Sequence, residues 1–267
     1  MSETVIQVTS LGKRIKGKTI LEDISFEINK GDCVALIGPN GAGKTVLMSC
    51  ILGDKKPSSG QVLIDGKAGK AKNKIAVLLQ ENTIPNSLKV EELIAFFQSI
   101  SDNPLTNQEV QDLLQFKEDQ YQQFADKLSG GQRRLLAFVL CLIDKPKILF
   151  LDEPTAGMDT STRQRFWEIV NDLKKAGTTI LYSSHYIEEV EHTADRILVL
   201  HQGKLIRDTT PYAMRHEEKE KQVTLPSRFV SIVHGLPDIY EITEKRDVVS
   251  FMTKDIEKVW QSLENSG

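Results

Sequence analysis

Apolar residues at the start of the chain gather into short runs of two kinds. Around residues 6–8 and 24–28, apolar and polar positions alternate, which is typical of strands with one buried face. Residues 33–37 are instead continuously apolar and lie between two glycines, which indicates a buried strand. The first two stretches therefore predict a pair of antiparallel strands, and the third predicts a strand inside the core.

Farther along, strand and helix patterns alternate up to about residue 201. Strand patterns cover residues 60–66, 75–79, 148–151, 178–182 and 197–201, and helical patterns cover 46–52, 91–100, 108–116, 132–143, 161–175 and 186–192. Either Thr106 or Asn107 can cap the helix at 108–116. The alternation predicts an α/β fold with a mostly parallel central sheet, and residues 81–143 are expected to form a helical subdomain beside it.

A charged run at residues 215–221 is expected to be a solvated helix or a linker, and it marks a boundary near residue 215. We therefore expect one domain at residues 1–214 and a small α+β appendage at 215–267. In the appendage, strand patterns cover 222–225, 239–243 and 248–252, and helical patterns cover 227–234 and 254–263. Phe251 and Trp260 are expected in its core.

Composition limits the classes of partner. Lys+Arg 34 against Asp+Glu 37 gives a net charge of −3, which argues against broad electrostatic binding of nucleic acid or anionic lipid. The first residues lack the features of a secretory signal, and the longest apolar run, 135–143, is too short to span a bilayer. Any membrane role is therefore expected to come through a partner.

Cys33, Cys50 and Cys141 lack C-x-x-C spacing and are expected to be buried thiols rather than a metal or redox site.

Residues 38–45 read Gly-Pro-Asn-Gly-Ala-Gly-Lys-Thr and fill every defining position of the phosphate-binding loop G-x-x-x-x-G-K-[ST]. A polyphosphate needs several backbone N–H groups turned inward, and glycines permit that curl. A helix that begins near Lys44 would direct its free N–H groups at the same anion. Lys44 supplies a cation for the terminal phosphates, and Thr45 supplies a hydroxyl for Mg²⁺. An ordinary glycine turn is the alternative that the complete motif disfavours.

Two acids, Asp152 and Glu153, follow an apolar strand that starts at Lys147. Nucleotide hydrolysis needs one carboxylate to hold Mg²⁺ and one group to orient or deprotonate the attacking water. Adjacent side chains on a strand point to opposite faces, but the strand ends here, so Glu153 can turn back toward the site. Such a pair alone is often a solvated loop, and the phosphate-binding loop favours the catalytic interpretation.

Read with these motifs, the sequence Leu128-Ser129-Gly130-Gly131-Gln132 makes the chain resemble the nucleotide-binding subunits of ATP-binding cassette (ABC) transporters. Further matches are Gln80, Ala156-Gly157-Met158-Asp159, and His185 in Ser183-Ser184-His185. The motifs keep the family's order from about residue 5 to 210. The resemblance implies a P-loop NTPase fold with an antiparallel β subdomain and a helical signature subdomain. It also implies an ATPase that uses ATP and Mg²⁺.

The resemblance implies a role for each matching residue. Glu153 is the implied catalytic base, His185 the implied contact to the terminal phosphate, and Gln80 the implied contact to Mg²⁺ and the attacking water. Thr45, Gln80 and Asp152 are the implied Mg²⁺ site. The implied ATP contacts are Ile15, Gly38, Pro39, Asn40, Gly41, Ala42, Gly43, Lys44, Thr45 and Val46. By themselves, Gln80 would be an ordinary amide at a strand end and His185 a loop or core histidine.

Residues 128–132 open a predicted helix, and the resemblance places them against the ATP of an opposite subunit, with Asp159 at the junction. It implies that the chain pairs with an identical or related ABC subunit.

Two positions depart from the family pattern. Ile15 stands where an aromatic residue commonly stacks on adenine, and Val46 stands where a second hydroxyl is common. We therefore expect an active site with modest affinity for ATP.

The segment Gln132-Arg133-Arg134-Leu135, the short helical insert and the appendage look like the ATPases of bacterial exporters of drugs, peptides or lipids. This resemblance implies a polytopic membrane permease as partner and a cytoplasmic location, peripheral on the inner face of the membrane. An importer ATPase is the alternative within transport. A soluble non-transport ABC ATPase and a non-catalytic nucleotide-binding module are the alternatives outside it. The presence of both Glu153 and His185 disfavours the last.

Overall fold

A computed structural model describes residues 3–68, 75–80, 84–85, 87–217, 221–236 and 238–264. The chain divides into two compact units, Met1–Pro211 and Tyr212–Gly267, close to the boundary expected near residue 215. Helix α8 (Pro211–Glu217) begins at the dividing point. Part of the charged run, residues 218–220, and the start of the expected helical subdomain, residues 81–83, lie outside the described residues.

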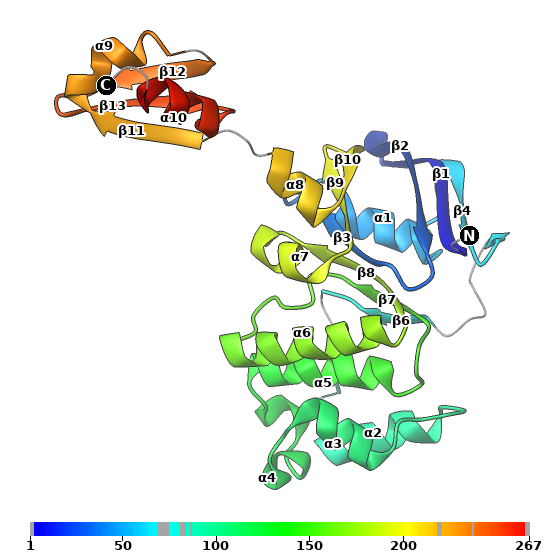
Figure 1. Cartoon of the computed structure of the whole chain (residues 1–267). Helices are drawn as coiled ribbons and strands as arrows, with labels where there is room; N and C mark the ends of the chain where they lie inside the picture. Colours follow the sequence, from blue (N-terminus) through cyan, green and yellow to red (C-terminus); the bar gives the residue numbers. More distant parts are fainter. Residues whose placement is uncertain are drawn as a thin grey trace. The chain divides into compact units, whose positions relative to one another are not determined.

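The first unit begins with an antiparallel sheet in the order β2-β1-β4-β5 (Figure 1). Its strands are β1 (Thr4–Ile15), β2 (Lys18–Asn29), β4 (Ser59–Ile64) and β5 (Lys67–Ala68). Alternate residues such as Ile6, Val8, Ile24 and Ile28 are buried against the core. This pattern confirms the two antiparallel strands predicted from the alternation at the start of the chain.

A second sheet, in the order β10-β9-β3-β8-β7-β6, forms the centre of the unit. Strands β9, β3, β8, β7 and β6 run parallel, and β10 pairs with β9 antiparallel. Their bounds are β3 (Cys33–Ile37), β6 (Ile75–Leu78), β7 (Ile148–Leu151), β8 (Thr179–Ser184), β9 (Arg196–His201) and β10 (Lys204–Thr209). The mostly parallel sheet is therefore confirmed.

Helices cover both faces of the central sheet, which explains why its strands are continuously apolar. Helix α1 (Lys44–Ile51) contributes Leu47 and Ile51 to a core that joins both sheets. Helices α5 (Gly130–Leu142) and α6 (Thr160–Lys175) lie together below the sheet in Figure 1. The rings of Phe138 on α5 and Phe166 on α6 are 4.3 Å apart. The remaining helices of this unit are α2 (Val90–Ser99), α3 (Asn107–Leu114), α4 (Glu118–Tyr121), a 3₁₀ turn at Ala125–Lys127 and α7 (Ile187–Thr193).

The register of the sheet brings its chemically important loops to one edge. Ile37, the last residue of β3, pairs with Ser184, the last residue of β8. Leu151, the last residue of β7, pairs with Tyr182 on the same strand β8. The segments that follow these strands begin at residues 38, 152 and 185, and they therefore emerge beside one another.

The second unit is a small sheet in the order β11-β13-β12 with short helices. Its elements are β11 (Lys221–Pro226), a 3₁₀ turn at Ser227–Phe229, α9 (Val230–Val233), β12 (Ile239–Glu244), β13 (Val248–Thr253) and α10 (Ile256–Glu264). The helix expected at residues 227–234 is therefore divided into two short pieces. Phe251 is buried as predicted, but the prediction for Trp260 is wrong, because its side chain is 52% exposed. Val259 takes the inward position on α10, and the next residue along a helix points away from it.

Candidate functional site

The loop at residues 38–45 connects β3 to the start of α1, where the phosphate-binding motif requires it. Gly43 adopts φ 109°, a conformation that favours glycine. A Cβ on Gly38 would lie 2.1 Å from the Leu200 carbonyl oxygen, so only glycine fits against β9. In the described structure no side chain caps α1, and its first turn holds no acid. The N–H groups at this helix end are therefore available to an anion.

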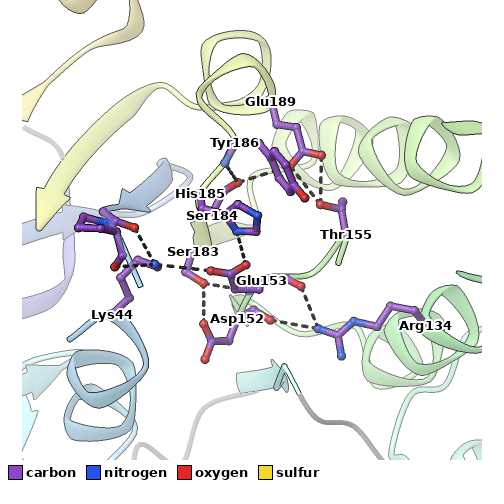
Figure 2. Close-up of polar contacts among 12 residues, drawn as sticks. Lys44, Arg134, Asp152, Glu153, Thr155, Ser183, Ser184, His185, Tyr186 and Glu189 are labelled. Carbon is purple, nitrogen blue, oxygen red and sulfur yellow. Dashed lines mark hydrogen bonds and ion pairs between the residues drawn. The ribbon is translucent and has the colours of Figure 1, made fainter. Parts of the chain in front are cut away.

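Lys44, the first residue of α1, directs its ammonium along the loop toward the strand ends (Figure 2). The residue is only 6% exposed, and its Nζ donates a hydrogen bond to the Gly38 carbonyl at 2.8 Å. The same Nζ lies 3.5 Å from Glu153 Oε1. A cation and a carboxylate thus face each other across the space between the loop and β7.

The acids after β7 occupy different environments. Asp152 is 2% exposed, and its Oδ1 accepts a hydrogen bond of 2.5 Å from the Ser183 hydroxyl. Glu153 has φ 46°, an uncommon value for a residue with a side chain. Its N–H donates to Ser183 Oγ at 2.8 Å. The chain turns at Glu153, and the carboxylate points back toward Lys44, as expected from the end of the strand.

His185 follows β8 and completes the constellation. Its Nδ1 lies 2.5 Å from Glu153 Oε2, so the two oxygens of this carboxylate face Lys44 and His185 respectively. The Tyr186 ring packs against the imidazole with ring centres 3.9 Å apart. Figure 2 shows Lys44, Glu153 and His185 directed toward one another from three separate segments.

Sequence reasoning gave no role to several polar residues that hold this edge together. Ser183 forms hydrogen bonds with both the Asp152 carboxylate and the backbone N–H of Glu153. It lies two residues before His185, and a hydroxyl residue at the end of an apolar strand could have indicated this role from the sequence. Glu189 on α7 accepts hydrogen bonds of 3.1 Å from the Thr155 hydroxyl and lies 3.4 Å from Arg163 Nε. These contacts link the segment after Glu153 to the segment after His185.

Arg134 is a further residue with no predicted role. Its guanidinium donates to backbone carbonyls at the ends of β6 and β7, including that of Gln80 at 3.2 Å and that of Asp152 at 3.0 Å. Burial lowers the pKa of Arg134, because the charged form loses hydration. Gln80 itself is exposed at the end of β6.

The remaining implied ATP contacts are residues of the loop, its neighbour Val46 and Ile15 at the end of β1. Pro39, Asn40, Gly41 and Thr45 are exposed, whereas Ala42 is buried and Val46 packs against the core. Ile15 ends β1 and is 37% exposed, so its side chain is accessible to a ligand.

The residues of the signature sequence form an exposed helix start. Ser129 caps α5: its Oγ accepts from the Gln132 N–H at 3.2 Å, and Gln132 Oε1 accepts from the Ser129 N–H at 3.1 Å. Leu128 is buried, whereas Ser129 and Gly130 are exposed. A Cβ on Gly131 would lie 3.1 Å from Asp159 Oδ2, so Asp159 borders this helix start and also caps α6. Within the described residues, no hydrogen bond or ion pair joins residues 128–132 to residues 38–46.

A metal ion bound beside the phosphate-binding loop would have few protein ligands. Among the described residues no group of three His, Cys, Asp or Glu side chains could hold a metal. The exposed Thr45 hydroxyl and the Asp152 carboxylate are hard oxygen donors beside the loop. This donor set fits Mg²⁺, which commonly takes one or two protein oxygens and completes its shell with phosphates and water.

No helix among the described residues is both long and apolar enough to cross a membrane.

Comparisons with known proteins agree with one another. A family profile described as "ABC transporter" matches residues 21–156. The chain is 33% identical over 229 residues to Nod factor export ATP-binding protein I of Rhizobium johnstonii, covering 82% of this chain and 73% of that protein. It is 30% identical over 244 residues to probable multidrug ABC transporter ATP-binding protein YbhF of Escherichia coli, covering 87% of this chain. The chain spans 42% of the length of that second relative.

Solved structures give the same comparison at the level of fold. One described as the ATP-binding subunit of an ABC transporter superposes with a TM-score of 0.70 at 26% identity, covering 80% of this chain and 92% of that one. A second, an ATP-binding cassette dimer in a post-hydrolysis state with ADP and Pi, gives 0.68 at 21% identity, covering 77% and 98%.

Proposed function

This chain belongs to the ABC transporter family, and on that premise we propose that it is the ATP-hydrolysing subunit that powers a separate membrane permease. The observation that carries the proposal is the position of Glu153 between Lys44 and His185. Its carboxylate has one oxygen 3.5 Å from the Lys44 ammonium and the other 2.5 Å from the imidazole.

The arrangement supports hydrolysis by direct attack of water on the terminal phosphorus. The glycine loop and the uncapped end of α1 bind the phosphates, and Lys44 leaves the Gly38 carbonyl to neutralise the terminal group. Glu153 takes the proton of the attacking water as the bond from phosphorus to the bridging oxygen breaks, so that ADP and phosphate are the products. His185 holds the Glu153 carboxylate in place and contacts the terminal phosphate.

Thr45, Asp152 and Gln80 are the residues proposed to hold Mg²⁺, which when bound would neutralise charge on the phosphate oxygens. Ser183 occupies one oxygen of the Asp152 carboxylate, which fixes the direction of the other. Gln80 lies at the end of β6 beside Asp152, whose N–H donates to the Leu78 carbonyl at 2.8 Å.

The exposed start of α5 supports a dimer in which each copy completes the other's site. Ser129 and Gly130 present a second helix N-terminus, and no hydrogen bond or ion pair among the described residues joins it to the loop of the same copy. We propose that it faces the ATP held by an identical or related subunit, with Asp159 at the junction. ATP would join the two halves, and hydrolysis with loss of phosphate would release them.

A permease partner is supported by exposed apolar side chains on the helical subdomain. Phe96 and Ile100, one turn apart at the end of α2, are 55% and 64% exposed, and Phe124 is 47% exposed. Large exposed apolar residues that gather on one part of a protein mark interaction sites. The names of the relatives support export as the direction of transport, and a position at the membrane through the permease follows from the same proposal.

Steady-state ATP turnover by the full chain tests this function. Glu153→Gln keeps the size of the side chain but removes its basicity, so turnover should fall by about 10²–10⁴-fold while Mg-ATP binding survives. Glu168→Gln is the matched control, because this exposed carboxylate pairs with Arg165 on the same helix. Equal turnover in the wild type and Glu153→Gln would refute the proposed role of Glu153.

A further inference from the structure

Arg134 gathers five backbone carbonyls from two strand ends. Its Nε donates to Pro154 O at 3.0 Å, and its Nη2 lies 3.0 Å from Asp152 O and 3.4 Å from Glu153 O. Its Nη1 donates to Leu79 O at 2.5 Å and Gln80 O at 3.2 Å. One side chain on α5 thus joins the segment after β6 to the segment after β7. Figure 2 shows the bonds from Arg134 to the segment after β7.

The planar guanidinium suits this position for a geometric reason. It offers five N–H donors in a fixed fork, whereas a lysine ammonium offers three donors around a single point. Only the guanidinium can donate hydrogen bonds to carbonyl groups on both sides of the fork at the same time. Within the described residues, every hydrogen bond of the Arg134 side chain ends on a backbone carbonyl.

Three of the carbonyls that accept from Arg134 lie at or next to Glu153, whose backbone conformation is unusual. Glu153 has φ 46°, and the carbonyls of residues 152, 153 and 154 all accept from Arg134. Ser183 accepts the Glu153 N–H. Such backbone conformations persist where surrounding contacts impose them, and here those contacts come from Arg134 and Ser183.

We propose that Arg134 is a positioning residue for ATP hydrolysis, which fixes the turn at residues 152–154 and thereby the aim of the Glu153 carboxylate. The proposal rests on the proposed function, in which Glu153 is the base. It also gives α5, which starts at the exposed Ser129–Gly130 tip, a direct connection to the edge where the water is activated.

Arg134→Lys in the full chain tests the proposal, with Arg133→Lys as the matched control on the same helix. Within the described residues the Arg133 side chain makes one hydrogen bond, from Nη2 to Asp126 O at 2.8 Å. A small misplacement of a catalytic group can cost about 100-fold, so kcat of Arg134→Lys should fall by about 10- to 100-fold. The Kd for ATP measured without Mg²⁺ should stay within about threefold, because the loop that binds phosphate is untouched. Arg133→Lys should leave both nearly unchanged.

The double variant Arg134→Lys with Glu153→Gln separates positioning from general damage. Because Arg134 acts through Glu153, the double variant should turn over ATP no more slowly than Glu153→Gln alone. A fully additive loss would overturn the proposal, and so would a kcat equal to that of Arg133→Lys or a rise in KM alone.

A wild-type chain that hydrolyses no ATP would contradict the proposed function instead. Hydrogen exchange at residues 152–156 then decides whether Arg134 fixes this turn, because the measurement needs no turnover. Faster exchange in Arg134→Lys than in Arg133→Lys supports the role, and equal exchange overturns it. Arg134→Gln, which keeps two N–H donors, replaces the lysine variant in every comparison if that variant fails to fold.

Discussion

At the scale of single residues, the aim of Glu153 depends on its backbone. The residue directly after a buried strand would ordinarily point away from its neighbour Asp152, yet φ 46° returns its carboxylate to Lys44 and His185. The order of residues predicted this turn. It did not predict Ser183 and Arg134, which hold the turn, because their contacts come from strands and helices far apart in the chain.

Ile15 and Val46 set the expected affinity for ATP. A tyrosine at position 15 would add ring stacking on adenine worth about 0.5–1.5 kcal/mol, and a threonine at position 46 would add a hydrogen bond worth about 1 kcal/mol. Ile15→Tyr with Val46→Thr should therefore lower the Kd for Mg-ATP by about 10- to 60-fold, measured by calorimetry in the Glu153→Gln background. Ile242→Tyr, at a position also 37% exposed, is the control. An unchanged Kd would show that these positions do not limit binding.

Cys33 links stability to alkaline pH. Burial raises the pKa of this thiol from 9.0 to about 12, with Asp195 and Asp32 adding to the rise and Lys174 opposing it. The folded state therefore holds the proton more tightly than the unfolded chain. This contribution is complete below pH 9 and is lost as pH rises toward 12, by at most about 1.4 kcal/mol per unit. Urea unfolding between pH 8 and 10.5 should show a shallower loss in Cys33→Ala, and equal slopes would contradict the burial effect.

At the scale of elements, the strands of the central sheet were predictable because both of their faces are buried. Strands β3, β7 and β8 are continuously buried and apolar runs mark them. Strand β10 carries no such mark, because it is an edge strand with mostly exposed residues. The Gln202-Gly203 pair before it, with φ 47° and 77°, is a two-residue hairpin turn that could have indicated it.

Among the proposed site residues, the sequence motifs alone predicted the loop and the acid pair. The role of His185 came from the family resemblance, because a histidine between serines carries no chemical signal of its own. The structure supplies the missing observation, its contact with Glu153. Trp260 was predicted wrongly because hydrophobicity does not state which side of α10 faces the sheet.

The close approach of the phosphate-binding loop to β9 makes Gly38 a structural as well as a functional residue. A Cβ there would meet the Leu200 carbonyl at 2.1 Å, and backbone cannot move aside cheaply. Gly38→Ala should reduce the free energy of unfolding by roughly 1–3 kcal/mol, measured with urea. Gly130→Ala is the contrast, because nothing lies within 4 Å of its Cβ position, and its stability should change by less than about 0.5 kcal/mol. Equal losses in the two variants would contradict this explanation.

At the scale of the whole molecule, a single copy carries two helix N-termini that we propose serve different ATP sites. The start of α1 belongs to the loop of its own copy, whereas the start of α5 is exposed and is proposed to serve a partner. On this proposal the protein needs its ligand in order to associate. Glu153 and His185, the proposed catalytic groups, are already in contact without a partner, so association would complete the site rather than assemble the base.

Sedimentation velocity of the Glu153→Gln chain, with and without saturating Mg-ATP, tests this account most directly. The substitution is expected to block turnover, so a nucleotide-bound assembly should accumulate. We expect a monomer without nucleotide and a dimer with Mg-ATP, and we expect Gly130→Ala in the same background to weaken the dimer. A chain that binds Mg-ATP yet stays monomeric at saturation, even with its permease present, would contradict the claim that two copies share each ATP.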